Sequence, residues 1–286
     1  MLLLDAMSLL FRSFFALPDM RTAEGVPTGG LYGLSSLLIK LIREHEPRGL
    51  AFAVDLPEPT FRHAAFGDYK AQRQRAPSPL VQQLRRLPEL MAALGAPVHG
   101  VPGFEADDVL ATLARKASEA GHPVLVVTGD TDLFQITTDQ IAVWYVGRRQ
   151  KDALRMDADA VRGRYGVEPA QIPTWKALVG DPSDNLPGLA GVGKKTASRW
   201  IVEHGNAAGI VAAAPTLKPA RLGPAVAEHG ADLELWEDLA TVRSELGVAV
   251  PHHGPFEAGA KAALASLYTE LAFKSLLPRL DALPTA

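Results

Sequence analysis

The sequence predicts an α/β fold with a mostly parallel central sheet flanked by helices. Short aliphatic runs, typical of strands that are buried on both faces, recur through the first half of the chain. They lie at residues 2–4, 50–54, 124–128 and 141–145. Segments with helical spacing of apolar residues separate these runs, and this alternation favours a parallel sheet. The length of 286 residues, 47% of them hydrophobic, suffices for one large domain or for a larger domain with a smaller companion.

The helices can be placed from their apolar faces. One helix follows Asp108, and another runs through residues 84–94, where we expect Pro88 to interrupt it. From about residue 175, short helices joined by Gly and Pro replace the strand signal. We therefore expect an α/β domain at 1–174 and a smaller helical lobe at 175–286. The last helix of the chain, at about 258–280, should pack back on the body.

The composition limits the chemistry that the chain can perform. It has no cysteine, so disulfides and thiolate metal sites are excluded and any metal must be held by oxygen or imidazole ligands. The apolar first residues lack a basic leader and contain Asp5, and no apolar run approaches the thickness of a bilayer. We expect no export signal, no membrane contact and a cytoplasmic setting.

Acidic residues follow the predicted strands directly. Asp5 follows the first run, Asp55 follows the second, and Asp130 and Asp132 follow the third. The carboxyl ends of parallel strands share one edge of a sheet, where open α/β sheets bind their ligands. We expect these four carboxylates to meet in one crevice.

Two further acidic clusters have suggestive spacing. Glu105, Asp107 and Asp108 open a predicted helix, and Asp181 and Asp184 lie three residues apart in GDPSDNLPG. Taken singly, each cluster has an ordinary structural explanation, because acids are favourable in the first helical turn and Asp, Asn, Gly and Pro build turns. Taken together with the strand-end acids, they predict a shared site.

Nine carboxylates cannot stay ionised in one crevice without a positive partner, because like charges raise each other's pKa. Oxygen ligands without thiols favour Mg²⁺ or Mn²⁺, and a pair of such ions is the usual device for phosphodiester hydrolysis. The net charge of −3 is unusual for a nucleic-acid-binding protein. Once these nine acids are set aside, however, the rest of the chain is basic.

Seven ordered motifs resemble those of the 5′ nuclease family, which comprises flap endonucleases, phage 5′ exonucleases and the nuclease domain of bacterial DNA polymerase I. They are LLDAMSLLFRSFFAL at 3–17, AFAVD at 51–55, FRHAAFGDYKAQR at 61–73, PGFEADDVLATLA at 102–114, VTGDTDLFQI at 127–136, GDPSDNLPGLAGVGKKTA at 180–197 and LAFKSLL at 271–277. The resemblance covers nearly the whole chain and implies a PIN-like sheet. The chain departs from the usual family pattern at Ala6, Met7, Phe11, Gln72 and Thr131, but it keeps all nine carboxylates.

The resemblance implies two metal clusters. The first is Asp5, Asp55, Glu105, Asp107 and Asp108, and the second is Asp130, Asp132, Asp181 and Asp184. Within these sets, Asp5, Asp55, Asp108, Asp130 and Asp132 are expected to be catalytic. The segment at about 186–203 is similar to the family's helix–three-turn–helix, which grips the duplex backbone and often binds K⁺. Its expected DNA contacts are Gly188, Gly191, Gly193, Lys194, Lys195 and Thr196.

The basic stretch at about 62–90 resembles the helical arch under which a 5′ single strand passes. By itself, such a stretch is most simply a solvated face. The resemblance implies instead that Arg62, Tyr69, Lys70 and Arg73 contact DNA, with Lys70 and Arg73 stabilising charge at the scissile phosphate. Arg12 also matches a family position near the active site.

We therefore predict a monomeric, metal-dependent 5′ nuclease that cleaves branched or 5′-ended DNA, including an RNA primer on DNA. Two alternatives remain open. One is a branched-DNA-binding protein without catalysis, and the other is an RNase or phosphatase on the same core. The GVGKKTA hairpin at 191–197 speaks against a small-molecule phosphatase, which has no need of a duplex clamp.

Overall fold

The computed structural model describes residues 1–147, 153–250 and 259–284. Six strands form one sheet in the order β3-β2-β1-β4-β5-β6, and all neighbours are parallel except the antiparallel pair β5 and β6. The strands are β1 (Leu2–Asp5), β2 (Leu50–Ala53), β3 (Val98–His99), β4 (Val124–Thr128), β5 (Ile141–Tyr145) and β6 (Leu154–Met156). The α/β class is confirmed, and the four predicted strands are β1, β2, β4 and β5.

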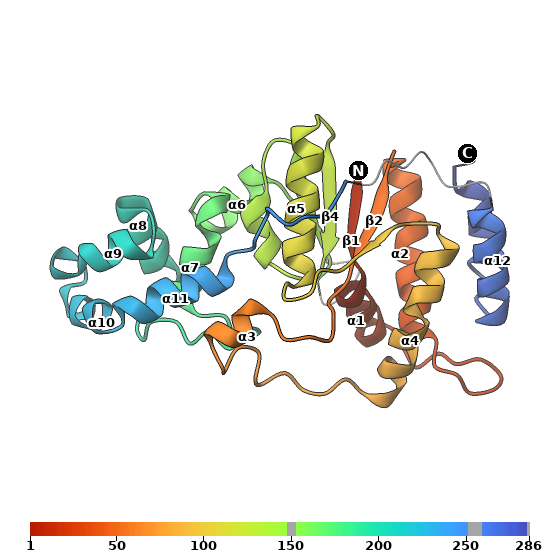
Figure 1. Cartoon of the computed structure of the whole chain (residues 1–286), viewed down its shortest axis with the longest axis horizontal. Coiled ribbons are helices and arrows are strands. Elements are labelled where there is room, and N and C mark those ends of the chain that lie inside the picture. Colours follow the sequence, from red (N-terminus) through yellow and green to blue (C-terminus); the bar gives the residue numbers. More distant parts are fainter. Residues whose placement is uncertain (148–152, 251–258, 285–286) are drawn as a thin grey trace.

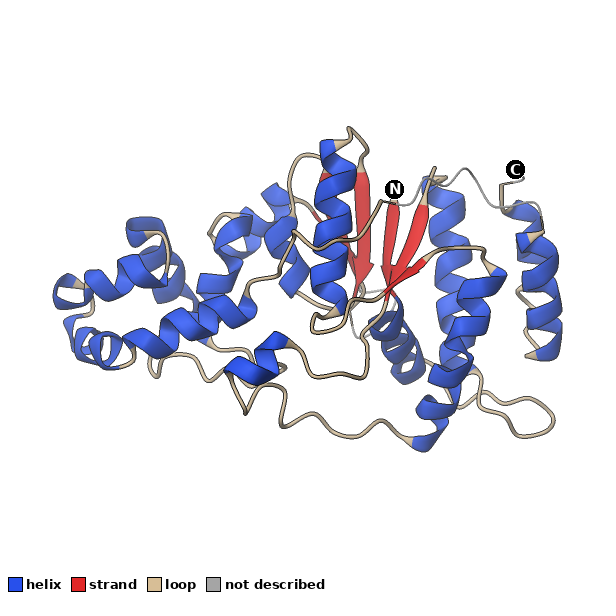
Figure 2. Cartoon of the chain, viewed as in Figure 1, coloured by secondary structure: helices blue, strands red, loops and turns tan. Residues whose placement is uncertain are grey.

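Helices cover both faces of this sheet (Figures 1 and 2). On one face lie α1 (Ala6–Ala16), α2 (Gly29–His45), α4 (Ser78–Ala93) and α12 (Ala260–Glu270), and on the other lies α5 (Ala106–Glu119). The alternation within β1 explains the two layers, since Leu2 and Leu4 pack into the first and Leu3 into the second. The expected interruption at Pro88 was wrong, because α4 continues through this residue to Ala93.

The arch differs from a continuous helical element. A short helix, α3 (Phe61–Ala65), is followed by turns and irregular chain at 66–77 before α4 begins. In Figure 1 this connection runs below the carboxyl ends of the strands.

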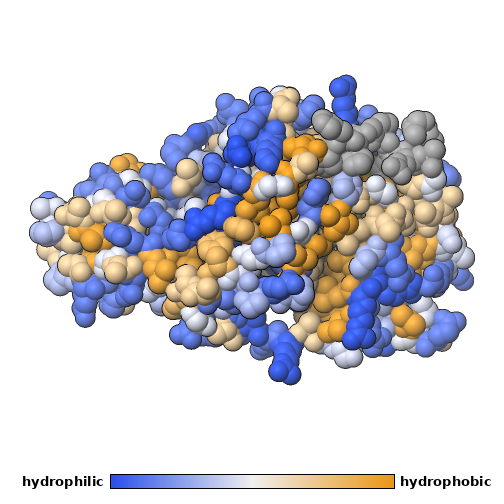
Figure 3. Space-filling view, in the orientation of Figure 1, coloured by the Kyte–Doolittle hydropathy of each residue, from blue (hydrophilic) through white to orange (hydrophobic). Residues whose placement is uncertain are grey.

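On the face shown in Figure 3, apolar side chains gather over the middle of the molecule. An apolar groove of about 550 Å³ lies beside α4.

The helical lobe extends from one end of the sheet (Figure 1). It contains α6 (Ala158–Tyr165), α7 (Ile172–Val179), α8 (Lys194–His204), α9 (Ala207–Ala212), α10 (Gly223–Glu228) and α11 (Gly230–Ala240). Its buried side chains, Trp175, Trp200 and Trp236 among them, form one continuous apolar core with those of α5 and β4. By contrast, α12 packs on α4, far from the lobe, so the end of the chain does return to the body.

Within the described residues, no helix has both the length and the hydropathy needed to cross a bilayer.

Candidate active site

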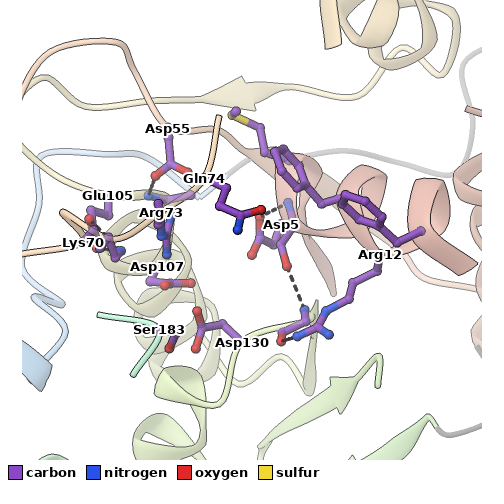
Figure 4. A pocket seen from close by; sticks show the side chains of 16 residues that line it. Asp5, Arg12, Asp55, Lys70, Arg73, Gln74, Glu105, Asp107, Asp130 and Ser183 are labelled. Atoms are coloured by element: carbon purple, nitrogen blue, oxygen red, sulfur yellow. Dashed lines mark hydrogen bonds and ion pairs between the residues drawn. The ribbon is translucent and has the colours of Figure 1, made fainter. Parts of the chain in front are cut away.

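The candidate site lies at the carboxyl ends of the three central strands. Asp5 is the last residue of β1, Asp55 follows β2 by two residues, and Asp130 follows β4 by two residues. Because β2, β1 and β4 are neighbours, these acids meet, and Asp107 joins them from the first turn of α5. All four line a pocket of about 680 Å³ and face a common space (Figure 4). We call Asp5, Asp55, Asp107 and Asp130 the strand-edge cluster.

Asp5 and Asp55 are held in place by the ends of α1 and α5. Asp5 is the N-cap of α1, where its Oδ1 accepts from the Ser8 backbone N–H at 3.1 Å, and its Oδ2 accepts from the Thr128 hydroxyl at 2.8 Å. The Oδ1 of Asp55 accepts from the Ala106 backbone N–H at 2.8 Å. Burial and the nearby charge of Asp55 together raise the pKa of Asp5 to about 7.

The strand-edge cluster fits a divalent cation. Burial, followed by the charges of Asp130 and Asp5, raises the pKa of Asp107 well above its usual value, and Oδ1 of Asp107 is buried without a hydrogen-bond partner. In the described part of the chain, no Lys or Arg forms an ion pair with any of the four carboxylates. Buried oxygens with raised pKa values and no ion-pair partner are the donors that a hard cation neutralises.

A second cluster consists of Asp132, Asp181 and Asp184, which offer carboxylate oxygens within 4.8 Å of one another. Lys176, a buried residue of α7, lies against it, with Nζ at 2.7 Å from Oδ2 of Asp181 and in contact with Asp132. Burial raises the pKa of Asp181, but Lys176 and Ser183 together bring it below its usual value. This second cluster therefore differs from the strand-edge cluster in having a positive partner.

Glu105 lies beside the second cluster and binds Lys70 of the arch. Nζ of Lys70 donates to both carboxylate oxygens of Glu105, at 2.8 and 2.9 Å, and lies 3.6 Å from Asp184. Burial disfavours the ammonium form of Lys70, but Asp184 and Glu105 raise its pKa above the usual value. Arg73 reaches Asp184 at 3.7 Å and is 56% exposed, so its guanidinium remains open to a ligand.

Tyr69, an expected DNA contact, has almost no exposed surface in this structure. Tyr69 is only 3% exposed, and its hydroxyl donates to Glu105 at 3.0 Å and to Asp184 at 3.3 Å. A buried ring cannot offer a stacking surface. Tyr69 instead fixes the arch to the carboxylates, next to Lys70.

Arg62 and Asp108 also differ from their expected roles. Arg62 is 2% exposed and binds Asp108 with two hydrogen bonds of 2.7 and 2.8 Å, so its guanidinium has no surface to present to DNA. Asp108 is fully buried and accepts two further bonds, from the backbone N–H groups of Glu105 and Arg243. With four donors, both of its oxygens are saturated; Asp108 is not among the residues that line the pocket, and it fixes the start of α5.

The remaining predicted contacts lie on two surfaces. Arg12 lines the pocket and donates to the Gly129 carbonyl at 2.6 Å. Gly191, Gly193, Lys194 and Lys195 are exposed in and after the turn that leads into α8, with Gly188 and Thr196 partly exposed beside them. Gly188 has a φ of +69°, and a Cβ at this position would lie 2.4 Å from the backbone nitrogen of Gly180. The turn therefore requires glycine there.

Sequence reasoning did not identify Lys176 as a site residue, although its position in the sequence is unusual. It is a cationic residue within the otherwise apolar helix IPTWKALV, directly before the GDPSDN turn. A lysine on a buried helix face needs an anionic partner, and the adjacent acids provide it. Thr128 and Ser183, which bind Asp5 and Asp181, gave no comparable signal.

Two models of protein families match the chain in succession. The model described as "5'-3' exonuclease, N-terminal resolvase-like domain" matches residues 1–166, and that described as "5'-3' exonuclease, C-terminal SAM fold" matches residues 167–257. Among curated proteins, DNA polymerase I of Mycobacterium leprae is 42% identical over 253 residues, covering 85% of this chain and 28% of that protein. The thermostable DNA polymerase I of Thermus thermophilus is 37% identical over 249 residues, covering 87% and 29%. The chain thus spans less than a third of these relatives.

Solved structures share the fold. A flap endonuclease of bacteriophage T5, in a pseudo-enzyme-product complex with DNA and metal ions, superposes with a TM-score of 0.70 at 19% identity over 98% of both chains. The catalytic core of Rad2 in complex with a DNA substrate gives a TM-score of 0.64 at 17% identity, over 97% of this chain and 92% of that one.

Proposed function

Because the chain belongs to the 5′-3′ exonuclease family, we propose that it hydrolyses phosphodiester bonds of branched or 5′-ended DNA with the help of divalent metal ions. The strand-edge cluster is the main observation that supports this proposal. Its four carboxylates face a pocket that Glu105 and Lys70 also line, two of the four have raised pKa values, and none forms an ion pair with Lys or Arg among the described residues. Such a site is costly in a folded protein unless a cation binds there.

All donors in the two clusters are oxygens, which favours Mg²⁺ or Mn²⁺. Bound ions of this kind act as Lewis acids, lowering the pKa of a water and offsetting charge on phosphoryl oxygens. The strand-edge cluster would hold the first ion, and Asp132, Asp181 and Asp184 the second. After burial, the charge of Asp130 raises the pKa values of both Asp107 and Asp184, so Asp130 would interact with both ions.

Lys70 and Arg73 are the groups of this chain that would stabilise the reacting phosphate. Both line the pocket, and both approach Asp184. A fixed ammonium and guanidinium stabilise the charge that develops on a phosphoryl group during in-line displacement. The products would be a 5′-phosphate and a 3′-hydroxyl. Arg12, on the opposite wall of the pocket, would contact the same strand.

The turn at 188–196 would bind the duplex beside the cut. Its backbone N–H groups precede an eleven-residue helix, and the ammonium groups of Lys194 and Lys195 add positive charge. We further propose that backbone carbonyls in this turn bind K⁺. We also propose that the protein acts as a monomer in the cytoplasm, where it cleaves DNA flaps or RNA primers paired with DNA.

The test is cleavage of 5′-labelled flap, nicked and blunt duplexes with Mg²⁺, Mn²⁺ or EDTA. We expect cutting with either ion and none with EDTA. Asp184→Asn and Lys70→Ala should each lower the rate by at least about a hundredfold. Asp159→Asn is the control, because this side chain is 92% exposed on α6 and should leave the rate unchanged.

Three outcomes would contradict the proposal, and a fourth would contradict its assignment of Asp184. Tight binding of the flap without cutting would indicate a DNA-binding protein. Cutting of RNA alone, or hydrolysis of a phosphomonoester but of no nucleic acid, would indicate an RNase or a phosphatase. Full activity in Asp184→Asn would remove this residue from the site.

A further inference from the structure

Lys176 occupies an unusual position for a lysine. It lies within α7, where all its neighbours in the helix from Ile172 to Leu178 are buried, and it is itself only 5% exposed. An ammonium group in such surroundings is stable only when anionic oxygens surround it. Nζ contacts Asp132 and lies 2.7 Å from Asp181, and both carboxylates are themselves largely buried.

This ammonium lies against three carboxylates that crowd together. The oxygens of Asp132, Asp181 and Asp184 come within 4.8 Å of each other, which is the spacing of ligands around a single cation. One oxygen of Asp184 is buried and accepts no hydrogen bond. Three negative charges at this spacing repel one another strongly unless a positive charge is shared among them.

The strand-edge cluster shows the opposite arrangement. Its four carboxylates line the open pocket, and none has an ion-pair partner in the described ranges of the chain. The two clusters thus differ, because one has an ion-pair partner built in and the other has none among the described residues.

We propose that the Lys176 ammonium is a resident cation of the second cluster, occupying it in place of a divalent ion. This inference rests on the proposed function only in taking the clusters to be metal sites. In the absence of DNA, the protein then binds one divalent ion firmly, at the strand-edge cluster. A second ion binds weakly, because it must displace Lys176 or share the carboxylates with it.

The test is Mn²⁺ binding by the full chain without DNA, measured as loss of the electron paramagnetic resonance signal of free Mn²⁺. Lys176→Met keeps most of the side-chain volume and removes the charge. We expect it to tighten binding of the second ion by at least about tenfold, since a unit charge acts at contact distance. Lys176→Arg should retain weak second binding. Lys40→Met is the control, because Lys40 is exposed on α2, where it pairs with Glu44.

A second measurement covers the case in which the variant folds poorly. Without metal, Lys176→Met leaves Asp132 and Asp181 without their ion-pair partner, so its melting temperature in EDTA should fall below that of the parent chain. Mn²⁺ should then raise it by more than it raises the melting temperature of the parent chain. A variant that binds its second Mn²⁺ no more tightly than the parent chain, or that gains no extra stabilisation from Mn²⁺, would overturn the inference.

These outcomes are independent of the nuclease assay. If the parent chain cuts no nucleic acid, the binding data still decide the role of Lys176. If it cuts flaps but Lys176→Met binds metal like the parent chain, the proposed function stands and the resident-cation inference fails.

Discussion

The buried pair of Arg62 and Asp108 allows a quantitative prediction. Arg62 donates two bonds to Asp108, one of 2.8 Å to the Leu239 carbonyl and one of 3.0 Å to the Thr241 carbonyl. Its guanidinium thereby joins α3, the start of α5 and the chain that leaves α11. In Arg62→Met, the Asp108 carboxylate loses its counter-charge in a site from which water is excluded.

We expect Arg62→Met to lower the free energy of unfolding by about 3–5 kcal/mol, the usual cost of removing one partner of a buried ion pair. Urea unfolding, followed by circular dichroism, measures this directly. The control is Arg73→Met, because Arg73 is 56% exposed and should cost at most about 1 kcal/mol. The double variant Arg62→Met with Asp108→Leu should cost less than the sum of the single variants, by about 1–3 kcal/mol.

Two results would refute this reasoning. One is an Arg62→Met protein that unfolds like the parent chain but binds flap DNA more weakly, as expected of a surface DNA contact. The other is strict additivity in the double variant, which would mean that the two side chains stabilise the fold independently.

Two further predictions concern pH and salt. The pKa of Asp5 in the folded protein, about 7, lies above its usual 3.8, so the metal-free folded protein binds a proton at Asp5 more readily than the unfolded chain does. In EDTA, its free energy of unfolding should therefore fall by a few kcal/mol as the pH rises from about 4 to about 7. Thermal melts should show this fall and its reversal by Mn²⁺, and a metal-free stability that rises over this range would contradict it. Replacing both Lys194 and Lys195 with Ala should reduce the slope of log affinity against log salt for flap DNA by about 2; an unchanged slope would exclude both from the phosphate contacts.

The sequence predicted the elements that are specified by a short, continuous run of residues. The strands β1, β2, β4 and β5 are continuous aliphatic runs, and Asp5, Asp55 and Asp130 follow such runs directly. The strands β3 and β6 contain two and three residues, too few for any periodicity, and their pairing is decided by their neighbours in the sheet. The continuation of α4 through Pro88 likewise depends on packing against α2 and α12, which sequence spacing does not report.

Within the site, sequence reasoning identified the acids together with Lys70 and Arg73, but it did not identify Arg62 and Lys176 as their buried counter-charges. Arg62 and Tyr69 look like a basic and aromatic surface in the sequence, yet the fold turns both inward. Their burial depends on residues far along the chain, such as Thr241 for Arg62 and Asp184 for Tyr69. Lys176 was overlooked for the converse reason, because a single charge in an apolar helix carries no motif.

The apolar core that runs from the sheet into the helical lobe bears on how this protein can be divided. The two family models meet between residues 166 and 167, but buried side chains on both sides of that point, including Val161, Val167 and Trp175, belong to one core. A fragment that stopped at residue 166 would expose this apolar surface to water and tend to aggregate. A boundary between sequence families is therefore no guide to where the polypeptide can be cut.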